Sequence, residues 1–164
     1  MTRTFVITGS ASGIGQSTAH KLKSLGNTVI GVDIHNADVI ADLSTHGGRI
    51  QAAEKAIAAS NNSIDAIVAC AGLAHPTAAT VSVNYFGVTE FINELLPTLS
   101  QSKTPRVAIT SSVASIMPNS SELVEAMCAN DEGKAVEIAQ ALVDAGAGGE
   151  QLIYGSTKRA ISRW

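Results

Sequence analysis

Two side chains near the end of the sequence, Tyr154 and Lys158, have types and a spacing that suit proton transfer. In a helix, residues four apart lie on the same face, so the phenol and the ammonium would be neighbours. A nearby cation stabilises a phenolate, which makes the exchange of a proton near neutral pH easier. Taken alone, the pair is equally compatible with an ordinary solvated helix face.

A hydroxyl elsewhere in the sequence strengthens the chemical interpretation. Ser112 follows the predicted strand of residues 106–110, and open α/β sheets bind their ligands at the carboxyl ends of strands. A hydroxyl at this place can hold a carbonyl oxygen beside Tyr154. The three side chains together predict a site that polarises a carbonyl group and exchanges a proton with its oxygen.

A glycine-rich turn, TGSASGIG at residues 8–15, lies between a predicted strand and a predicted helix. Gly9 suits a tight turn, Gly13 a close approach of the backbone to a pyrophosphate, and Gly15 close packing of the helix on the sheet. The helix N-terminus would face the phosphates with free N–H groups. The spacing is GxxxGxG rather than GxGxxG, so a purely structural turn is the alternative.

An acid, Asp33, ends the second predicted strand. A carboxylate there can accept hydrogen bonds from ribose hydroxyls, and it would repel a 2′-phosphate. Neither residues 10–12 nor Ile34 and His35 supply a guanidinium for such a phosphate. The sequence therefore predicts NAD in preference to NADP, the alternative being an acid that merely ends a strand.

The elements that must position these groups alternate along the chain. Strands are predicted at residues 5–7, 28–33, 39–41, 64–69 and 106–110, and helices at residues 13–25, 49–59, 79–99, 122–127 and 131–145. The strands are continuous apolar runs, which is typical of a parallel sheet buried on both faces. Helices between them indicate right-handed crossovers. The predicted fold class is α/β, an open, doubly wound parallel sheet in a single domain over residues 1–164.

Two local predictions concern what these helices contact. In the helix of residues 13–25, the side chains expected on the buried face are Ile14, Ala19, Leu22 and Leu25. Residues 113–150 read as a helical insertion, whose glutamates form a solvated face or line a substrate pocket. The apolar residues 113–117, directly after Ser112, favour contact with a hydrophobic carbonyl compound.

The composition excludes several classes of protein. Charged residues make up 15% of the chain and the net charge is −3, which argues against disorder and against nucleic-acid binding. No apolar run reaches 18 residues and no signal-peptide pattern is present, so no membrane segment is predicted. Cys70 and Cys128 are isolated from each other and from histidine, which predicts buried thiols, no metal and a cytoplasmic location.

These features occur in a familiar order: TGSASGIG, Asp33, Asp42-Leu43, Ala71-Gly72, Asn84, Ser111-Ser112, and Tyr154 with Lys158. In this order the sequence resembles the short-chain dehydrogenases/reductases, which have a Rossmann-like fold. The segment VSVNYFG at 81–87, the run SSVAS and the insertion resemble the 3α-hydroxysteroid dehydrogenase/carbonyl reductase group. The resemblance implies an NAD-dependent oxidoreductase that interconverts a secondary alcohol, a hydroxysteroid being one candidate, and a ketone, and a homo-oligomer in full-length form.

The resemblance also implies roles for single residues. Tyr154 would be the general acid in reduction and the base in oxidation, Lys158 would assist it and bind the nicotinamide ribose, and Ser112 would orient the carbonyl. Asn84 would hold a water in a proton relay. The implied cofactor-binding residues are Gly9, Ser12, Gly13, Ile14, Gly15, Asp33, Asp42, Leu43, Ala71, Gly72, Tyr154 and Lys158.

The sequence departs from the family pattern in two places. Residues 69–72 read ACAG where the family often has NNAG, which removes side-chain hydrogen bonds from that turn. The chain also reaches Trp164 within a predicted helix, so the resemblance implies a C-terminal truncation that leaves the strand of residues 106–110 at an exposed edge. The alternative function is therefore a catalytically impaired nucleotide-binding or interaction protein. A sugar-nucleotide epimerase matches the glycine spacing less well.

Overall fold

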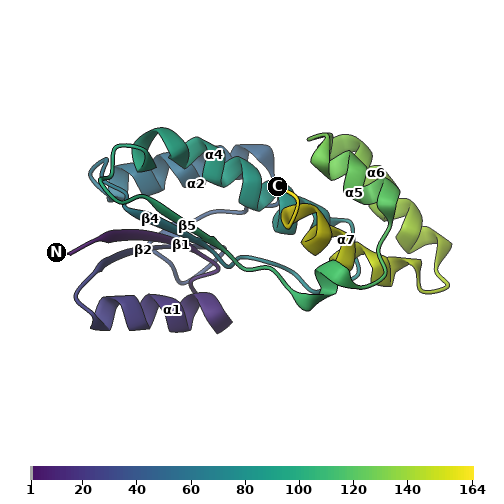
Figure 1. The fold of residues 1–164 in the computed structure, drawn as a ribbon, viewed down its shortest axis with the longest axis horizontal. Helices are drawn as coiled ribbons and strands as arrows, with labels where there is room; N and C mark the ends of the chain where they lie inside the picture. The colour runs from purple at the N-terminus through teal and green to yellow at the C-terminus, as the bar shows by residue number, and fades with distance from the viewer. Residues whose placement is uncertain (1) are drawn as a thin grey trace. The chain divides into compact units, whose positions relative to one another are not determined.

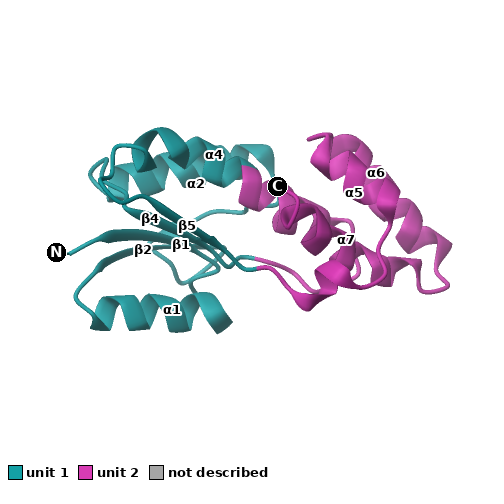
Figure 2. Ribbon diagram, in the orientation of Figure 1, with its two compact units in different colours: residues 1–71, 90–110 teal, residues 72–89, 111–164 magenta. Residues whose placement is uncertain are grey.

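The computed structural model describes residues 2–164, and the chain divides into two compact units (Figure 2). Unit 1 comprises the chain up to Ala71 together with Glu90–Thr110, and unit 2 comprises Gly72–Thr89 and Ser111–Trp164. The organisation into a single domain remains a prediction.

Unit 1 is built around a five-stranded parallel sheet, in the order β3-β2-β1-β4-β5. Its strands are β1 (Thr4–Thr8), β2 (Thr28–Asp33), β3 (Val39–Ile40), β4 (Ala66–Ala69) and β5 (Arg106–Ile109). Helix α1 (Gly13–Ser24) lies on one face, and α2 (His46–Ala59) with the part of α4 (Gly87–Leu99) from Glu90 onward lies on the other (Figure 1). The predicted α/β fold with a parallel, doubly wound sheet is therefore confirmed.

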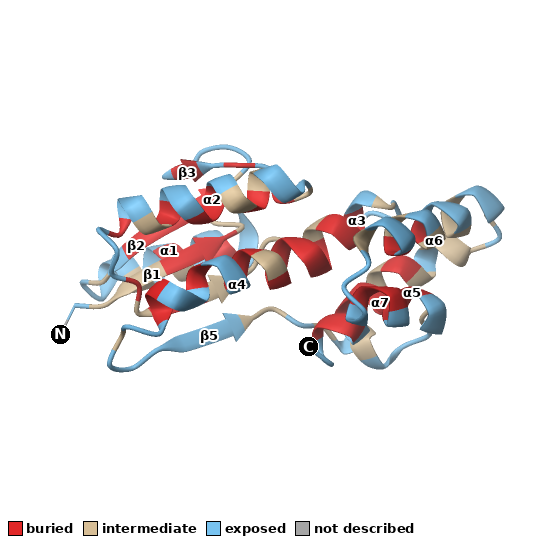
Figure 3. Cartoon of the chain, turned by 90° about the horizontal axis from the view of Figure 1, so that it is seen from above, coloured by how far each residue is buried: buried red, intermediate tan, exposed pale blue. Residues whose placement is uncertain are grey.

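The core of unit 1 follows the central strands. Val6, Ile7, Val32 and Ile67 are fully buried, because β1, β2 and β4 are covered on both faces. Strand β5 is an edge strand, and its first three residues are exposed (Figure 3).

The prediction for the buried face of α1 is wrong at two positions. Ile14 and Leu25 are 65% and 62% exposed, whereas Gly15 and Ala19 are buried and Leu22 is partly buried. The inward face follows the i, i+4, i+7 spacing that begins at Gly15, so Ile14 is rotated out of it. Apolar character alone therefore did not identify the side that packs on the sheet.

Unit 2 consists of helical segments. They are α3 (Ala79–Val81), the π-helical turn η1 (Ser82–Phe86), the first residues of α4, the 3₁₀ turns η2 (Val113–Ile116) and η3 (Gly149–Gln151), and the helices α5 (Ser121–Cys128), α6 (Glu132–Ala145) and α7 (Leu152–Ile161). Ser120 and Asp131 cap α5 and α6, since their side chains accept hydrogen bonds from Leu123 N and Lys134 N. The helices predicted within 113–150 are thus present. Helix α7 ends at Ile161. The prediction that the helix continues to Trp164 is therefore wrong.

The cysteines are less buried than predicted. Cys70 is partly buried, and Cys128, the last residue of α5, is exposed. Within residues 2–164, no group of three or more His, Cys, Asp or Glu side chains is arranged to hold a metal ion. No helix in the same range is long and apolar enough to cross a membrane.

One carboxylate fastens the N-terminal end of the sheet and leads to a prediction about acid stability. Asp65 accepts hydrogen bonds from Ser102 Oγ (2.6 Å) and Thr4 N (2.9 Å), and these contacts, that from Ser102 first, hold the pKa of Asp65 below its usual value. A carboxyl whose pKa is lower in the folded state stabilises the fold above its unfolded pKa of about 3.9. That contribution is lost as the pH falls through the folded-state pKa.

We therefore expect Asp65→Asn to lower the free energy of unfolding by about 1 kcal/mol at pH 7, with a smaller difference from the unmodified chain at about pH 3, below the unfolded pKa of about 3.9. Urea unfolding at both pH values measures it. Glu54→Gln, on α2, is the control, because the Glu54 carboxylate forms no hydrogen bond or ion pair with any described residue. An equal loss at pH 7 and pH 3 would contradict the assignment to the charged carboxylate.

Candidate cofactor-binding and active site

The glycine-rich turn is held tightly by two of its glycines. Gly9 has φ +70°, and a Cβ there would lie 2.8 Å from the backbone N of Ala71. At Gly15 a Cβ would lie 2.1 Å from the carbonyl oxygen of Gly9. The turn therefore packs directly against the start of α1 and the end of β4.

The N-terminus of α1, behind this turn, is open. Ser12 is the N-cap residue, but its side chain makes no capping hydrogen bond, and the first turn of α1 contains no acid. The backbone N–H groups of residues 13–15 have no acceptor in the described part of the chain. At Gly13 (φ +52°), no described atom lies within 4 Å of a Cβ position. Free N–H groups at the positive end of a helix dipole suit a phosphate, so the arrangement fits the pyrophosphate of a dinucleotide.

Asp33 connects the glycine-rich turn to the end of β2. Its Oδ2 accepts a hydrogen bond from Ala11 N (2.9 Å), and its Oδ1 accepts one from Ile34 N (2.7 Å). Each carboxylate oxygen has a further lone pair. The carboxylate is thus fixed beside the turn and keeps acceptor capacity for ribose hydroxyls.

In the ACAG turn of residues 69–72, backbone N–H groups donate to a side chain of β1, whereas the family pattern supplies hydrogen bonds from side chains of the turn itself. Thr8, which is 1% exposed, accepts hydrogen bonds at Oγ1 from Cys70 N (3.2 Å) and Ala71 N (3.1 Å). This buried hydroxyl holds the end of β4 against β1. In unit 2, a Cβ at Gly72 would lie 3.2 Å from Asn84 Oδ1, so a glycine permits the close approach of that amide.

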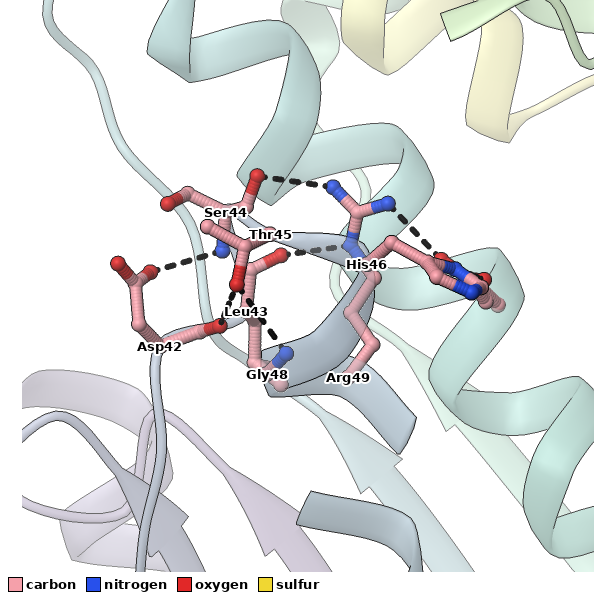
Figure 4. Close-up of polar contacts among 8 residues, drawn as sticks. Asp42, Leu43, Ser44, Thr45, His46, Gly48 and Arg49 are labelled. Atoms are coloured by element: carbon pink, nitrogen blue, oxygen red, sulfur yellow. Dashed lines mark hydrogen bonds and ion pairs between the residues drawn. The ribbon is translucent and has the colours of Figure 1, made fainter. Parts of the chain in front are cut away.

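Asp42 and Leu43 lie in the segment between β3 and α2 (Figure 4). Asp42 is exposed, and its Oδ1 accepts a hydrogen bond from Ser44 N (2.8 Å). Hydrogen bonds from Ser44 hold the pKa of Asp42 below its usual value, so this acid is charged at neutral pH. Leu43 is 6% exposed, so its side chain belongs to the core.

In unit 2, Asn84 lies within the π-helical turn η1 and is 1% exposed. Its Oδ1 accepts from Leu73 N (2.7 Å), and its Nδ2 donates to Leu73 O (2.9 Å) and Thr157 Oγ1 (3.2 Å). The amide therefore connects the turn after Gly72 to α7. Because these contacts occupy the side chain, a water held at this residue would depend on its backbone. Single π-helical turns are frequent at functional sites.

Tyr154 and Lys158 lie one turn apart on α7, as the spacing predicted. Lys158 Nζ is 5.7 Å from the centroid of the Tyr154 ring, within the range of a cation–π contact. Lys158 is only 6% exposed, whereas Tyr154 is partly buried. A buried ammonium therefore lies close to the ring of a more accessible phenol on the same helix.

Ser112 begins the segment on which α7 packs. It is the N-cap residue of η2, and its Oγ accepts a hydrogen bond from Ala114 N (3.2 Å), which leaves the hydroxyl proton able to bind a further oxygen. A Cβ at Gly155 would lie 3.0 Å from Pro118 O, and Ser156 Oγ accepts from Ser120 N (2.9 Å). Small residues thus bring the helix of Tyr154 close to the segment that follows Ser112.

The residues between Tyr154 and Lys158 have a packing role that the sequence pattern alone did not reveal. Gly155, Ser156 and Thr157 are all buried and each fixes α7 to another part of unit 2. Their small size was the available signal, because small side chains in succession on a helix permit close approach of neighbouring backbone.

The predicted site residues fall into two groups. Unit 1 contains the glycine-rich turn with Ser12 and Ile14, together with Asp33, Asp42, Leu43 and Ala71. Unit 2 contains Gly72, Asn84, Ser112, Tyr154 and Lys158. The first group is suited to bind the phosphates and adenosine of a dinucleotide, and the second is suited to move a proton.

Comparison with known proteins gives a consistent result. The family model for short chain dehydrogenases matches residues 3–124. The 3-alpha-hydroxysteroid dehydrogenase/carbonyl reductase of Comamonas testosteroni is 40% identical over 162 residues, which cover 96% of this chain and 62% of that protein. The chain therefore spans somewhat less than two thirds of the length of this curated relative.

Solved structures give the same fold. The crystal structure of the 3-alpha-hydroxysteroid dehydrogenase from Pseudomonas sp. B-0831 in complex with NADH matches with a TM-score of 0.89 and 39% identity, covering 98% of this chain and 69% of that one. Menthone neomenthol reductase from Mentha piperita matches with a TM-score of 0.72 and 19% identity, covering 98% and 82%, which shows the fold alone. The glycine-rich turn, the parallel sheet and these matches place the chain in the short-chain dehydrogenase family.

Proposed function

We propose that this protein is an NAD-dependent oxidoreductase that interconverts a secondary alcohol and a ketone. The observation that carries the proposal is the placing of the buried Lys158 ammonium 5.7 Å from the ring of the more accessible Tyr154. Membership of the short-chain dehydrogenase family supports it. A protein that only bound a nucleotide would have no need of this pair.

The proposed roles follow from the chemistry of each side chain. When bound, the nicotinamide ring supplies the hydride chemistry. In reduction Tyr154 donates its phenolic proton to the substrate oxygen, and in oxidation its phenolate accepts the proton from the alcohol. Lys158 stabilises that phenolate, and Ser112 donates a hydrogen bond to the same oxygen. Asn84 is proposed to support a proton relay through its backbone, since its amide binds residues 73 and 157.

We further propose that NAD is preferred over NADP. The Asp33 carboxylate, fixed by Ala11 N and Ile34 N, would accept hydrogen bonds from ribose hydroxyls and repel a 2′-phosphate. The remaining residues of the glycine-rich turn would hold the pyrophosphate at the N-terminus of α1.

The proposed substrate is an apolar carbonyl compound. Val113, Ile116 and Met117 are 72%, 79% and 55% exposed and follow Ser112 directly, so they offer an apolar surface next to the proposed carbonyl position. The names of the relatives from Comamonas and Pseudomonas make a 3-ketosteroid the first substrate to test. Assembly into a homo-oligomer and a cytoplasmic location remain part of the proposal.

The test is a titration of the chain with NADH and NADPH, followed by a turnover assay. We expect nicotinamide fluorescence to show binding of NADH at least about tenfold tighter than of NADPH, because a carboxylate meets the extra phosphate. Oxidation of NADH at its absorbance band with a panel of ketones, a 3-ketosteroid included, measures activity. Binding without turnover of any ketone would overturn the enzyme proposal, and equal affinities would overturn the cofactor preference.

A further inference from the structure

A fully buried arginine, Arg49, binds the backbone of the segment that follows Asp42 (Figure 4). Arg49, on α2, is 0% exposed, and its guanidinium donates from Nε to Leu43 O (2.8 Å) and from a terminal nitrogen to Ser44 O (3.1 Å). Burial of a guanidinium is costly unless its donors are paired. Here its rigid fork is used to hold two consecutive backbone carbonyls.

An acid from another helix forms an ion pair with this arginine. Glu90, on α4, accepts a hydrogen bond at Oε2 from Arg49 (2.8 Å), and its other oxygen, Oε1, contacts His46 Nδ1. The Glu90 side chain is 25% exposed. One carboxylate therefore fixes both the guanidinium and the first residue of α2.

The segment held by this pair has little freedom left. Thr45 Oγ1 accepts a hydrogen bond from Gly48 N (3.1 Å), and a Cβ at Gly48 would lie 1.9 Å from the carbonyl oxygen of Asp42. Asp42 is also bound through its own Oδ1 to Ser44 N. Arg49 binds the carbonyl of Ser44, and the N–H of the same residue donates to the Asp42 carboxylate, so the pair supports the orientation of that carboxylate through Ser44.

We propose that Arg49 and Glu90 are positioning residues for the adenine end of the dinucleotide site. The pair holds Asp42 so that its carboxylate accepts a hydrogen bond from the exocyclic amine of adenine. This inference rests on the proposed function and on the resemblance to the short-chain dehydrogenases, which implies that Asp42 lies near the adenine of the cofactor. We expect neither Arg49 nor Glu90 to touch the nucleotide. Arg49 acts through the backbone carbonyls of residues 43 and 44, and Glu90 acts by holding Arg49.

A purely structural role of the pair predicts a different result. Hypoxanthine has a carbonyl oxygen where adenine has an amine, so a fixed carboxylate binds adenine and repels hypoxanthine. If the pair only stabilised the fold, its loss would weaken binding of both bases equally. If it positions Asp42, its loss lowers the preference for adenine over hypoxanthine.

The experiment compares NADH with reduced nicotinamide hypoxanthine dinucleotide, each titrated against the unmodified chain, Glu90→Gln and Arg49→Lys. Glu94→Gln is the matched control, because Glu94 is exposed and one turn further along α4. We expect about tenfold preference for NADH in the unmodified chain and the control, falling to about threefold or less in both test variants. Faster hydrogen exchange at the Ser44 amide, which donates to Asp42, is expected in Glu90→Gln.

The outcomes separate this inference from the proposed function. If the unmodified chain binds neither dinucleotide, the proposed function and this inference both fail. If it binds NADH, and Glu90→Gln keeps its preference and its Ser44 exchange rate, only the inference fails. Circular dichroism checks the fold of each variant. Should Arg49→Lys not fold, Glu90→Gln decides the question, because glutamine keeps the volume of the side chain and removes the negative charge that pairs with the guanidinium.

Discussion

Replacing Tyr154 by Phe is expected to lower the rate of ketone reduction by about 10²- to 10⁴-fold, the usual contribution of a positioned general acid. The change removes one hydroxyl and keeps the ring over which Lys158 Nζ lies at 5.7 Å. Helix α7 and its contacts through Gly155 and Ser156 do not involve that hydroxyl. The loss is therefore expected in the rate constant of turnover and not in the Kd for NADH.

Tyr85→Phe is the matched control for this experiment. Tyr85 also lies in unit 2, but it is 3% exposed, and burial raises its pKa, so it remains a neutral phenol. Steady-state reduction of a ketone and NADH fluorescence should be measured on both variants. Undiminished turnover in Tyr154→Phe, or an equal loss in Tyr85→Phe, would falsify the assignment of the proton donor.

The second large effect is expected at Gly15, where a single methyl group has no room. In Gly15→Ala the new Cβ would lie 2.1 Å from the carbonyl oxygen of Gly9 and 2.7 Å from its carbonyl carbon. Both contacts are with backbone, so either α1 or the glycine-rich turn must move. We expect a loss of about 2–3 kcal/mol in the free energy of unfolding, the cost of overpacking a close contact. NADH affinity should fall about 100-fold or more, because the N–H groups at the start of α1 are displaced.

Gly47→Ala supplies a control for the same substitution in a helix. No described atom lies within 4 Å of a Cβ at Gly47, in the first turn of α2. Alanine is favoured over glycine in helices by up to about 1 kcal/mol, so this variant should be as stable as the unmodified chain or more stable, with unchanged NADH affinity. Urea unfolding and NADH titration measure both variants, and normal NADH binding by Gly15→Ala would show that the turn does not hold the pyrophosphate.

Much of the fold could be predicted because its signals are local. Apolar runs of four to six residues such as Thr28–Asp33 identify strands, and a glycine-rich turn between a strand and a helix needs only neighbouring residues to define it. The spacing of Tyr154 and Lys158 likewise needed only that the segment be a helix, which it is. The predictions for these elements depend on periodicity and backbone freedom, which the sequence contains directly.

Two of the predictions that failed concern how a single helical side chain is buried. Ile14 was placed inward because it is apolar, but the packing of Gly15 on Gly9 turns it outward. Cys128 was expected to be buried, but it is exposed at the end of α5. For each of these residues, side-chain type gave the wrong environment because the helix orientation is decided by other residues.

The sequence by itself determined the order of strands and helices, the family and the residue types available for chemistry. Only the tertiary structure decided that Arg49 is buried against Glu90, 41 residues further along the chain, and that the Asn84 amide is bound to Thr157, 73 residues away. Local propensity specifies an element, whereas a contact between distant residues depends on the packing of several elements at once. The supports behind the candidate site therefore became visible only in the folded chain.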